Sequence, residues 1–390
     1  MCGILFHRFR REPARREVYA TALGRMASRG PDHEGFSAGD GFRAGHRRLA
    51  IIDLDPEANQ PFWSADGRYV LTYNGELYNY REVAARLLAA GVRCRTASDT
   101  EVVLLALDTF GVEPALRQFR GMFAFVLHDT VAGTTLAVRD HFGQKPLYYA
   151  TLDDGVIFAS DPLAVIDISG RREPDRGAYE AYLATATSTG TRGLHTTRQS
   201  FFAGVEIVPA GHILRVARDG GVALERYFAP WELVDEDRHR ELAARDGDAL
   251  LDELDALLAQ SVARHLVSDV PAGVLLSGGI DSSAVFWYAA ARNGSLQTFT
   301  KTSPGIETLP LTVVPQLLQR RPATAHFILQ RKATFVRELD SFVRRSHAPS
   351  RWNSGPSMES LCHAARRNGV LVLLGGDCID EFFGGYIHYR

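Results

Sequence analysis

The chain has 390 residues, of which 45% are hydrophobic and 23% charged, and 44 basic side chains nearly balance 46 acidic ones. This composition is typical of a globular protein with room for two domains, and it excludes collagen-like, disordered and disulfide-scaffold classes. The near-neutral charge gives no electrostatic reason to expect a nucleic acid as partner. No apolar run approaches the roughly 20 residues of a membrane span. We therefore expect a cytoplasmic protein without nucleic-acid or membrane partners.

Four cysteines, Cys2, Cys94, Cys362 and Cys378, are scattered along the chain without a CxxC pair. The spacing indicates neither a zinc site nor a disulfide framework. The last three are expected to be small buried side chains. Cys2 differs, because removal of the initiator methionine would leave it with both a thiol and a free amine. An amine with a pKa of about 8 can take the thiol proton. A chance cysteine at position 2 is the alternative.

The first half of the chain predicts strands, tight turns and a few helices. Residues 17–28 and 80–90 carry apolar side chains at helical spacing. Ser98 and Glu101 form a capping-box pattern for a further helix that stops at Gly111. Runs of strands with few helices between them indicate an α+β layered domain.

Turn signals separate the expected strands. The apolar run before Asn74-Gly75 ends on a strong hairpin-turn signal. Residues 121–150 predict two strands around a glycine-containing turn, and 155–160 predict another strand. The polar stretch 209–248 is interpreted as a last strand pair followed by a linker.

The second half predicts a different architecture. An amphipathic helix over 249–265 is followed by short apolar strands that alternate with helical segments. This alternation indicates a parallel, doubly wound α/β sheet. The prolines between 304 and 327 argue against a regular helix there.

Seven segments in the first half share their order and spacing with one known family. They are MCGI (1–4), SRGPD (28–32), HRRLAIID (46–53), YNGELYN (73–79), SDTE (98–101), GMFAF (121–125) and RDHFGQKPLYY (139–149). Through them, residues 1–210 resemble the class II glutamine amidotransferase domain. The resemblance implies an N-terminal-nucleophile sandwich fold and glutamine hydrolysis to glutamate and ammonia. Cys2 would attack the side-chain amide of glutamine.

The resemblance also implies roles for residues around Cys2. The side-chain amide of Asn74 and the backbone N–H of Gly75 would form an oxyanion hole, where each donor contributes about 2.7–4 kcal/mol. Arg48 would pair with the substrate α-carboxylate, a planar group that suits a bidentate guanidinium. Glu76 and Asp99 would hold the α-ammonium. A simple hairpin turn at Asn74-Gly75 is compatible with these roles.

A second set of motifs begins at SGGIDSS (277–283), which follows a short apolar strand and opens a helix. Backbone N–H groups at such a junction suit a phosphate, although the Walker A pattern is absent. With the preceding SDVPAGVLL (268–276), it resembles the pyrophosphatase loop of the asparagine synthetase family. That family adenylates a carboxylate with ATP and Mg²⁺ and releases pyrophosphate. The implied pyrophosphate-binding residues are Ser277, Gly278, Gly279, Asp281 and Ser282.

The segment GGDCIDEFFGGY (375–386) is similar to the family's second metal-binding segment. Asp281 and Asp380 would be the Mg²⁺ ligands, since Mg²⁺ prefers oxygen donors and few protein carboxylates. The implied nucleotide contacts are Gly375, Gly376, Leu275 and Lys301, of which Lys301 is unusual for the family. A solvated turn is the alternative for the acidic residues of this segment.

One catalytic position departs from the family. Asp377 stands where the family has a Glu that positions or deprotonates the attacking amine. Asp is one methylene shorter, and a misplacement of about 1 Å can cost about a hundredfold in rate. The identity of the acceptor carboxylate, aspartate in the parent family, is therefore open.

Together the motifs predict a glutamine-dependent, ATP-using amidotransferase most similar to asparagine synthetase. We expect an amidotransferase domain over 1–210, terminal strands and a linker over 211–248, and a synthetase domain over 249–390. The expected small-molecule partners are glutamine, ATP and a carboxylate acceptor, and a homodimer is compatible because dimers are common in the family. Two alternatives are an amide synthetase of specialised metabolism that uses another carboxylate, and a synthetase-dead regulatory protein that retains glutaminase.

The length of the chain bears on the second activity. Family members continue well past the FGGY motif through helices that include a lysine expected to stabilise pyrophosphate. This chain stops at Arg390. We therefore expect the nucleotide half to be a fragment, to be completed by a partner or to be degenerate.

Overall fold

The computed structural model describes residues 1–390 except 14, 187–197, 304–308, 350–353 and 386–390. The chain forms two compact units, Met1–Asp235 and Glu236–Arg390, and each is described by itself. Among the described residues, no helix has the length and apolar character needed to cross a membrane.

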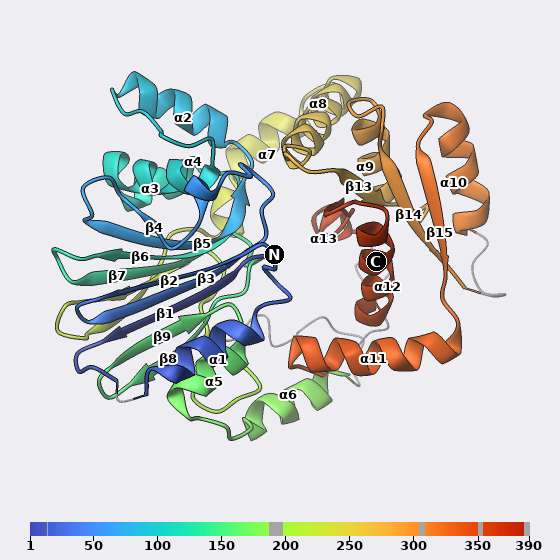
Figure 1. The fold of residues 1–390 in the computed structure, drawn as a ribbon. Coiled ribbons are helices and arrows are strands. Elements are labelled where there is room, and N and C mark those ends of the chain that lie inside the picture. The colour runs from blue at the N-terminus through green and yellow to red at the C-terminus, as the bar shows by residue number, and fades with distance from the viewer. Residues whose placement is uncertain (14, 187–197, 304–308, 350–353, 386–390) are drawn as a thin grey trace. The chain divides into compact units, whose positions relative to one another are not determined.

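Two six-stranded antiparallel sheets make up the first unit (Figure 1). The first has the order β10-β8-β9-β1-β3-β2, and the second β12-β11-β7-β6-β5-β4. The strands are β1 (Gly3–Phe9), β2 (His33–Gly39), β3 (Phe42–Arg48), β4 (Phe62–Trp63), β5 (Tyr69–Leu77), β6 (Gly121–Asp129), β7 (Thr134–Arg139), β8 (Tyr148–Leu152), β9 (Gly155–Ala159), β10 (Glu206–Ile207), β11 (His212–Val216) and β12 (Val222–Arg226).

Alternating side chains of both sheets fill the space between them. Ile4 and Phe6 from β1 are fully buried there, together with Val70 of β5 and Val126 of β6. Helices cover the outer faces, with α1 and α5 on the first sheet and α3 on β5 of the second. The helices of this unit are α1 (Glu17–Arg25), η1 (Pro56–Ala58), α2 (Tyr80–Ala89), α3 (Asp99–Phe110), α4 (Val112–Gln118), α5 (Pro162–Ser169), α6 (Arg176–Ala186) and η3 (Pro230–Leu233).

The predicted N-terminus of α3 is confirmed, but the capping box is not. Ser98 is the N-cap and accepts a hydrogen bond from the Thr100 N–H at 3.2 Å. Glu101 does not reach back to the Ser98 N–H. Its buried carboxylate accepts from the backbone of Arg95 at 2.8 Å and of Thr96 at 2.7 Å instead. Glu101 therefore holds the loop before the helix rather than the first turn.

The hairpin turn predicted at Asn74-Gly75 is wrong. Both residues lie inside β5, where Asn74 pairs with Ala124 and Gly75 with Phe123 of β6. Long-range pairing with β6 outweighs the local turn preference, because each ladder contact satisfies a backbone group that a turn would leave to solvent. The turn expected between the next two strands is confirmed, with Gly133 at φ +70° between β6 and β7.

The second unit contains a four-stranded parallel sheet with the order β15-β14-β13-β16. Helices α8, α9 and α10 pack on one face and α12 on the other, which confirms the predicted doubly wound arrangement (Figure 1). The elements are α7 (Glu236–Ala243), α8 (Gly247–His265), β13 (Ala272–Leu275), α9 (Ile280–Ala290), β14 (Gln297–Thr302), α10 (Leu309–Arg320), β15 (Thr324–Leu329), α11 (Lys332–Ser346), α12 (Ser354–Arg367), β16 (Val372–Leu374) and α13 (Ile379–Phe383).

The strand order determines where a ligand can bind. From β13 the chain first builds outward through β14 and β15, and then returns to place β16 on the other side of β13. This reversal makes a topological switch point between β13 and β16, and ligands of such sheets bind there at the carboxyl ends of the strands. The segments that follow these two strands are 276–279 and 375–378.

Part of the stretch 304–327 is helical, contrary to the prediction; residues 304–308 lie outside the described residues. Helix α10 contains Pro315 in its interior. An interior proline costs about 3 kcal/mol. Val314 is fully buried against the sheet and Leu317 packs beside it, so tertiary burial of the apolar face outweighs that cost.

Two further expectations are corrected. The stretch interpreted as a linker up to Asp248 contains α7 as well as β11 and β12, the expected strand pair. Cys94 is half-buried, and Cys362 and Cys378 are exposed, so they are not buried hydrophobes. Cys362 lies on α12 and Cys378 in the turn before α13, where no core covers them. All four cysteines are free thiols.

Candidate functional site

The position of Cys2 follows from strand pairing. Antiparallel pairing of β1 with β3 joins Gly3 to Arg47, which brings Cys2 beside Leu49. The Cys2 Sγ accepts from the Leu49 N–H at 3.4 Å, and the thiol lies 3.6 Å from the Leu49 carbonyl oxygen. Cys2 directly precedes β1, whose Ile4 and Phe6 face the space between the sheets.

The electrostatic surroundings of Cys2 include an amine that can serve as a base. Burial raises the pKa of the Cys2 thiol, while the Leu49 N–H, the N-terminal amine and Lys145 lower it. Burial also lowers the pKa of the Met1 amine to about 6. An amine with that pKa is mostly unprotonated at neutral pH, so it can accept a proton. Removal of Met1 would transfer the amine to Cys2 itself.

Asn74 and Gly75 lie side by side on β5, and each carries an N–H donor. The Asn74 side chain is 1% exposed, and its Nδ2 donates to no residue that the structure describes. The Tyr73 and Leu77 N–H groups point away from β6 and donate to Gln60 and Asp99, respectively. Alternation along the strand directs the Gly75 N–H to the same edge, between these two. This arrangement can accept an oxyanion.

Glu76 and Asp99 form an acidic pair in this region. Burial raises the pKa of Glu76 to about 7 and that of Asp99 to about 6. Lys145 holds the pKa of Glu76 down, and hydrogen bonds from Leu77 and Tyr73 hold that of Asp99 down. Two neighbouring carboxylates are suited to a bound ammonium group.

Arg48 is buried, but its guanidinium is already occupied. It donates to the Asp55 carbonyl oxygen at 2.9 Å, to the Asn59 side-chain oxygen at 2.8 Å and to the Asp53 carbonyl oxygen. In this structure Arg48 therefore stabilises the loop 52–59. A bidentate pairing with a substrate carboxylate would require the guanidinium to exchange some of these acceptors.

The sequence interpretation missed two cationic residues of this region. Arg29 donates from Nε to the Cys2 carbonyl oxygen at 3.1 Å, and its buried Nη2 has no partner among the described residues. Lys145 is 6% exposed and interacts electrostatically with Cys2 and Glu76. Both lie inside segments used for the resemblance, SRGPD and RDHFGQKPLYY. A charged side chain inside a motif segment was the signal that could have indicated a role in the site.

The second unit contains a cavity of about 1170 Å³ at the switch point of its sheet. Among its lining residues are nearly all of the positions implied by the resemblance. These are Leu275, Ser277, Gly279, Asp281, Ser282, Lys301, Gly375, Gly376, Asp377 and Asp380. Gly278, which is not in the lining, has φ +83° and makes the turn between Ser277 and Gly279.

The turn after β13 is closed by serine side chains. The Ser282 hydroxyl accepts from the Ser277 N–H at 3.2 Å and lies 2.9 Å from the Ser277 hydroxyl. The N-terminus of α9 begins directly after this turn, at Ile280. Backbone N–H groups of such a turn and helix start favour a phosphate.

Asp281 and Asp380 lie close to one another in this cavity. Burial raises the pKa of Asp281, and the carboxylates of Asp380 and Glu381 raise it further. A Cβ atom at Gly376 would lie 2.8 Å from the Asp281 Cβ, so the two loops touch. No group of three or more His, Cys, Asp or Glu suited to a metal occurs in the described part of the chain. Two carboxylates fit Mg²⁺ when substrate phosphates supply further ligands.

Asp377, Leu275 and Lys301 line different parts of the cavity. A Cβ atom at Gly375 would meet an Asp377 carboxylate oxygen at 2.6 Å, so that side chain folds back over the Gly375 backbone. Leu275 pairs with Phe299, which places Lys301 two residues further along β14, level with Ser277. Lys301 therefore lies at the carboxyl end of the sheet, beside the turn that follows β13.

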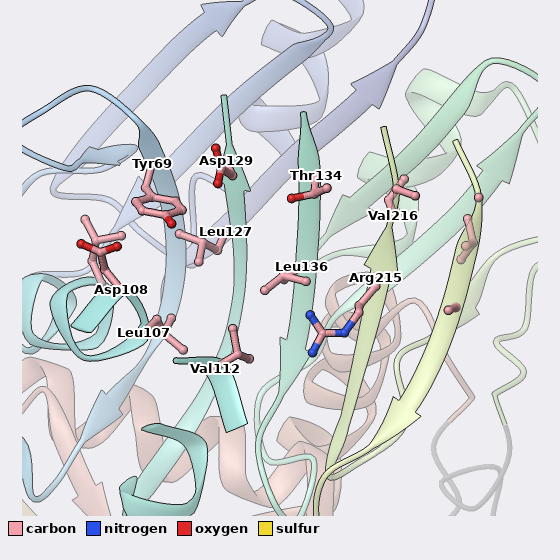
Figure 2. A pocket seen from close by; sticks show the side chains of 15 residues that line it. Tyr69, Leu107, Asp108, Val112, Leu127, Asp129, Thr134, Leu136, Arg215 and Val216 are labelled. Carbon is pink, nitrogen blue, oxygen red and sulfur yellow. The ribbon is translucent and has the colours of Figure 1, made fainter. Parts of the chain in front are cut away.

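Another cavity, of about 560 Å³, lies on the second sheet of the first unit (Figure 2). Figure 2 shows Leu127 and Leu136 on adjacent strands with Leu107 opposite them. Asp129 accepts from Arg68 at 2.7 Å, so its charge is compensated. None of the residues predicted to act in catalysis or binding lines this cavity.

Comparison with known proteins links both halves to one family. Residues 1–228 match the family model of the glutamine amidotransferase domain, and residues 253–390 match that of asparagine synthase. Asparagine synthetase [glutamine-hydrolyzing] 1 of Bacillus subtilis is 32% identical over 94% of this chain and 55% of its own length. A putative asparagine synthetase of Mycobacterium bovis is 34% identical over 95% of this chain and 58% of its own length.

A relative with a different name is also found. Amidase chry2 of Gibberella zeae is 29% identical over 96% of this chain and 56% of its own length. The chain thus spans little more than half the length of these curated relatives. Two family models in series and similarity along nearly the whole chain lead to one assignment. The chain belongs to the glutamine-hydrolysing asparagine synthetase family, with a glutamine amidotransferase domain followed by an asparagine synthase domain.

Proposed function

We propose that the first unit hydrolyses glutamine at Cys2 and that the second uses ATP to activate a carboxylate that receives the ammonia. The observation that carries the glutaminase proposal is the buried Asn74 amide. Its Nδ2 has no partner among the described residues, and alternation along β5 places Asn74 on the same face as Val70, which lies in the core between the sheets. A buried unsatisfied donor costs about 1–3 kcal/mol, and a bound oxyanion would remove that cost.

In the proposed glutaminase reaction, the amine freed by Met1 removal takes the Cys2 proton. The thiolate attacks the side-chain carbonyl carbon of glutamine, and the oxygen gains charge between the Asn74 Nδ2 and the Gly75 N–H. The protonated amine returns its proton to the departing nitrogen, ammonia leaves, and water then hydrolyses the thioester to glutamate and the free Cys2 thiol. Glu76 and Asp99 would bind the substrate α-ammonium, and Arg48 its α-carboxylate after release of part of the loop 52–59.

A histidine base is not needed in this scheme. Burial lowers the pKa of His46 to about 3, so this nearby imidazole is neutral. Its Nε2 lies 2.9 Å from the Tyr73 carbonyl oxygen, an acceptor, so that nitrogen carries the proton and donates it. His46 therefore supports the strand that carries Asn74.

For the second unit, we propose that ATP binds in the 1170 Å³ cavity with its phosphates on the turn 277–282. Asp281 and Asp380 would hold Mg²⁺, which screens phosphate charge when bound. Gly375, Gly376, Leu275 and Lys301 would contact the nucleotide. A carboxylate oxygen would attack the α-phosphorus to give an acyl-adenylate and pyrophosphate, and ammonia would then displace AMP to give an amide. Aspartate is the proposed acceptor.

Another acceptor is the second candidate, and Asp377 favours it. This residue is shorter than the Glu expected at its position, and the cavity wall contains the apolar side chains of Phe299, Met358 and Leu361. The relative named as an amidase also shows that the family includes differently named activities. A carboxylate with an apolar substituent would fit such a wall.

Glutamate release from glutamine tests the first activity. Wild-type chain should release glutamate, and Cys2→Ala should release none. Cys94→Ala is the matched control, because Cys94 is a half-buried free thiol outside the site. Glutamate release by Cys2→Ala at the wild-type rate would overturn the glutaminase proposal.

Exchange of pyrophosphate into ATP, with a panel of carboxylates, tests the second activity without ammonia transfer. Exchange with aspartate alone would favour asparagine synthesis, and exchange with another carboxylate would favour the second candidate. Absence of exchange with every carboxylate, in a chain that releases glutamate, would overturn the synthetase proposal and favour the regulatory alternative.

A further inference from the structure

Lys145 has no part in the function proposed above, although it is buried in the glutaminase half. It is 6% exposed, and burial lowers the pKa of its ammonium, while the Glu76 carboxylate and the Cys2 thiol raise that pKa. Burial disfavours the charged form of an ammonium unless nearby acidic groups compensate it. A neutral side chain at this position would avoid that penalty, so the charge itself is expected to have a role in the site.

The backbone of Lys145 is fixed next to the strand that carries Asn74 and Glu76. One carboxylate oxygen of Asp140 accepts both the Lys145 N–H at 3.0 Å and the Phe123 N–H at 3.2 Å. Phe123 stands opposite Gly75 in the β5–β6 pairing. From the other side, the Arg139 Nε donates to the Lys145 carbonyl oxygen at 2.8 Å. The loop after β7 therefore holds Lys145 at the end of the sandwich where Cys2 lies.

The ammonium interacts with two acidic groups there. Burial lowers the pKa of Lys145, and the Glu76 carboxylate and the Cys2 thiol raise it. In return, Lys145 lowers the pKa of Glu76 and of Cys2. The other charged groups that act on these three residues are the N-terminal amine, Arg29, Asp99 and Asp140.

We propose that the Lys145 ammonium is the fixed counter-charge of this centre, compensating the Glu76 carboxylate and the thiolate formed at Cys2. The Cys2 proton passes to the N-terminal amine, so the pair becomes thiolate and ammonium, while Lys145 keeps its own proton. Lys145 acts through Cys2 and Glu76 and is a positioning residue. This inference rests on the proposed glutaminase function for its role in turnover.

Alkylation of Cys2 tests the counter-charge without requiring turnover. The rate of iodoacetamide labelling of the N-terminal peptide is followed by mass spectrometry from pH 5 to 10, because only the thiolate reacts. In Lys145→Met, we expect the labelling curve to move up by about one pH unit and the rate at pH 7 to fall about tenfold. In Lys145→Arg, which keeps the charge, the rate should stay within about threefold of wild type.

Glutamine hydrolysis supplies a second readout. In Lys145→Met, the KM for glutamine should rise about tenfold at pH 7 and recover toward pH 8.5, because Glu76 then ionises only at higher pH. A residue that merely fills space would change neither the labelling curve nor this pH profile. Arg117→Met is the matched control, since it removes one exposed positive charge from the same unit, and both readouts should stay within twofold of wild type.

The outcomes separate the two proposals. If the labelling curve of Lys145→Met overlays that of wild type, the proposal that Lys145 is the counter-charge is wrong. If wild type releases no glutamate but the curve still moves, the glutaminase function fails and the counter-charge stands. Near-UV circular dichroism establishes folding of each variant. Lys145→Gln replaces Lys145→Met in the same assay if the latter does not fold.

Discussion

The Asp99 carboxylate accepts a hydrogen bond from the Tyr73 hydroxyl at 3.0 Å, and both side chains are buried. The same oxygen accepts the Leu77 N–H at 2.9 Å. These two donors stabilise a carboxylate that burial otherwise disfavours, since burial raises the pKa of Asp99 to about 6. The start of α3 is thereby joined to β5, on which Asn74 and Glu76 lie.

Removing the Tyr73 hydroxyl should weaken glutamine binding. Tyr73→Phe deletes a hydrogen bond to a charged group, which contributes about 1.5–3 kcal/mol. The pKa of Asp99 then rises above about 6, so we expect the KM for glutamine to increase more at pH 7 than at pH 8.5. Tyr149→Phe is the control, because Tyr149 donates to Glu206 at 2.7 Å outside the site. An equal increase at both pH values would contradict the role of Asp99 ionisation.

Replacing Asn74 should slow turnover without unfolding the protein. Loss of one oxyanion donor lowers kcat by about a hundred- to a thousandfold, so Asn74→Ala should keep its KM and lose that factor. Asn79 is the matched control, since its side chain donates to the Gln118 carbonyl oxygen at 3.0 Å and accepts the Arg120 N–H at 2.9 Å. Asn79→Ala should lower the free energy of unfolding by about 1–3 kcal/mol and leave kcat near that of wild type. Similar kinetic losses in both variants would argue against the oxyanion hole.

Glu76 should make the stability of the chain depend on pH. Its pKa rises from 4.5 to about 7 on folding, so between these values the folded state binds more protons than the unfolded state. The free energy of unfolding therefore falls as the pH rises from about 4.5 to about 7, by up to about 3 kcal/mol. Glu76→Gln removes this contribution. The free energy of unfolding of the variant, minus that of wild type, should therefore increase as the pH rises over the same range.

Urea unfolding at pH 5 and at pH 8 measures that difference. Glu113→Gln, at an exposed position of α4, should follow wild type at both pH values. If Glu76→Gln also follows wild type, the Glu76 carboxylate does not titrate in this window.

Asp281 should be required for adenylation but not for glutaminase. We expect Asp281→Asn to lower pyrophosphate exchange by a hundredfold or more in the presence of Mg²⁺, because one of two carboxylates for the metal is lost. Glutamate release without ATP should stay within twofold of wild type. Asp340→Asn is the control, as Asp340 is exposed and pairs with Arg344 on α11 at 2.9 Å. Unchanged exchange in Asp281→Asn would refute the metal role of this residue.

Features with strong local determinants were predictable. The cap at Ser98, the stop at Gly111 and the turn at Gly133 depend on a few adjacent residues, and the structure contains each of them. The parallel sheet followed from short apolar strands alternating with helical segments, since parallel neighbours need a crossover. Most of the residues predicted for a nucleotide site also line one cavity, because they follow two strands that meet at a switch point.

The errors have a common cause in long-range packing. Asn74-Gly75 has the composition of a turn, but pairing with β6 keeps both residues extended. Pro315 opposes a helix locally, but burial of Val314 and Leu317 retains it. Glu101 fits a capping box, but two backbone N–H groups of the preceding loop compete for its carboxylate. The roles of the predicted site residues stay predictions.

The sequence by itself determined the family, the order of the two units and the residues whose spacing carries the motifs, because those signals are local and recur in a fixed order. Only the tertiary structure decided which groups are desolvated and which are already occupied. It buried Lys145 close enough to Glu76 for their charges to interact, whereas it surrounded the Arg48 guanidinium with loop acceptors. Charge and hydrogen-bonding capacity depend on neighbours brought together from distant parts of the chain, and spacing along the sequence does not encode them directly.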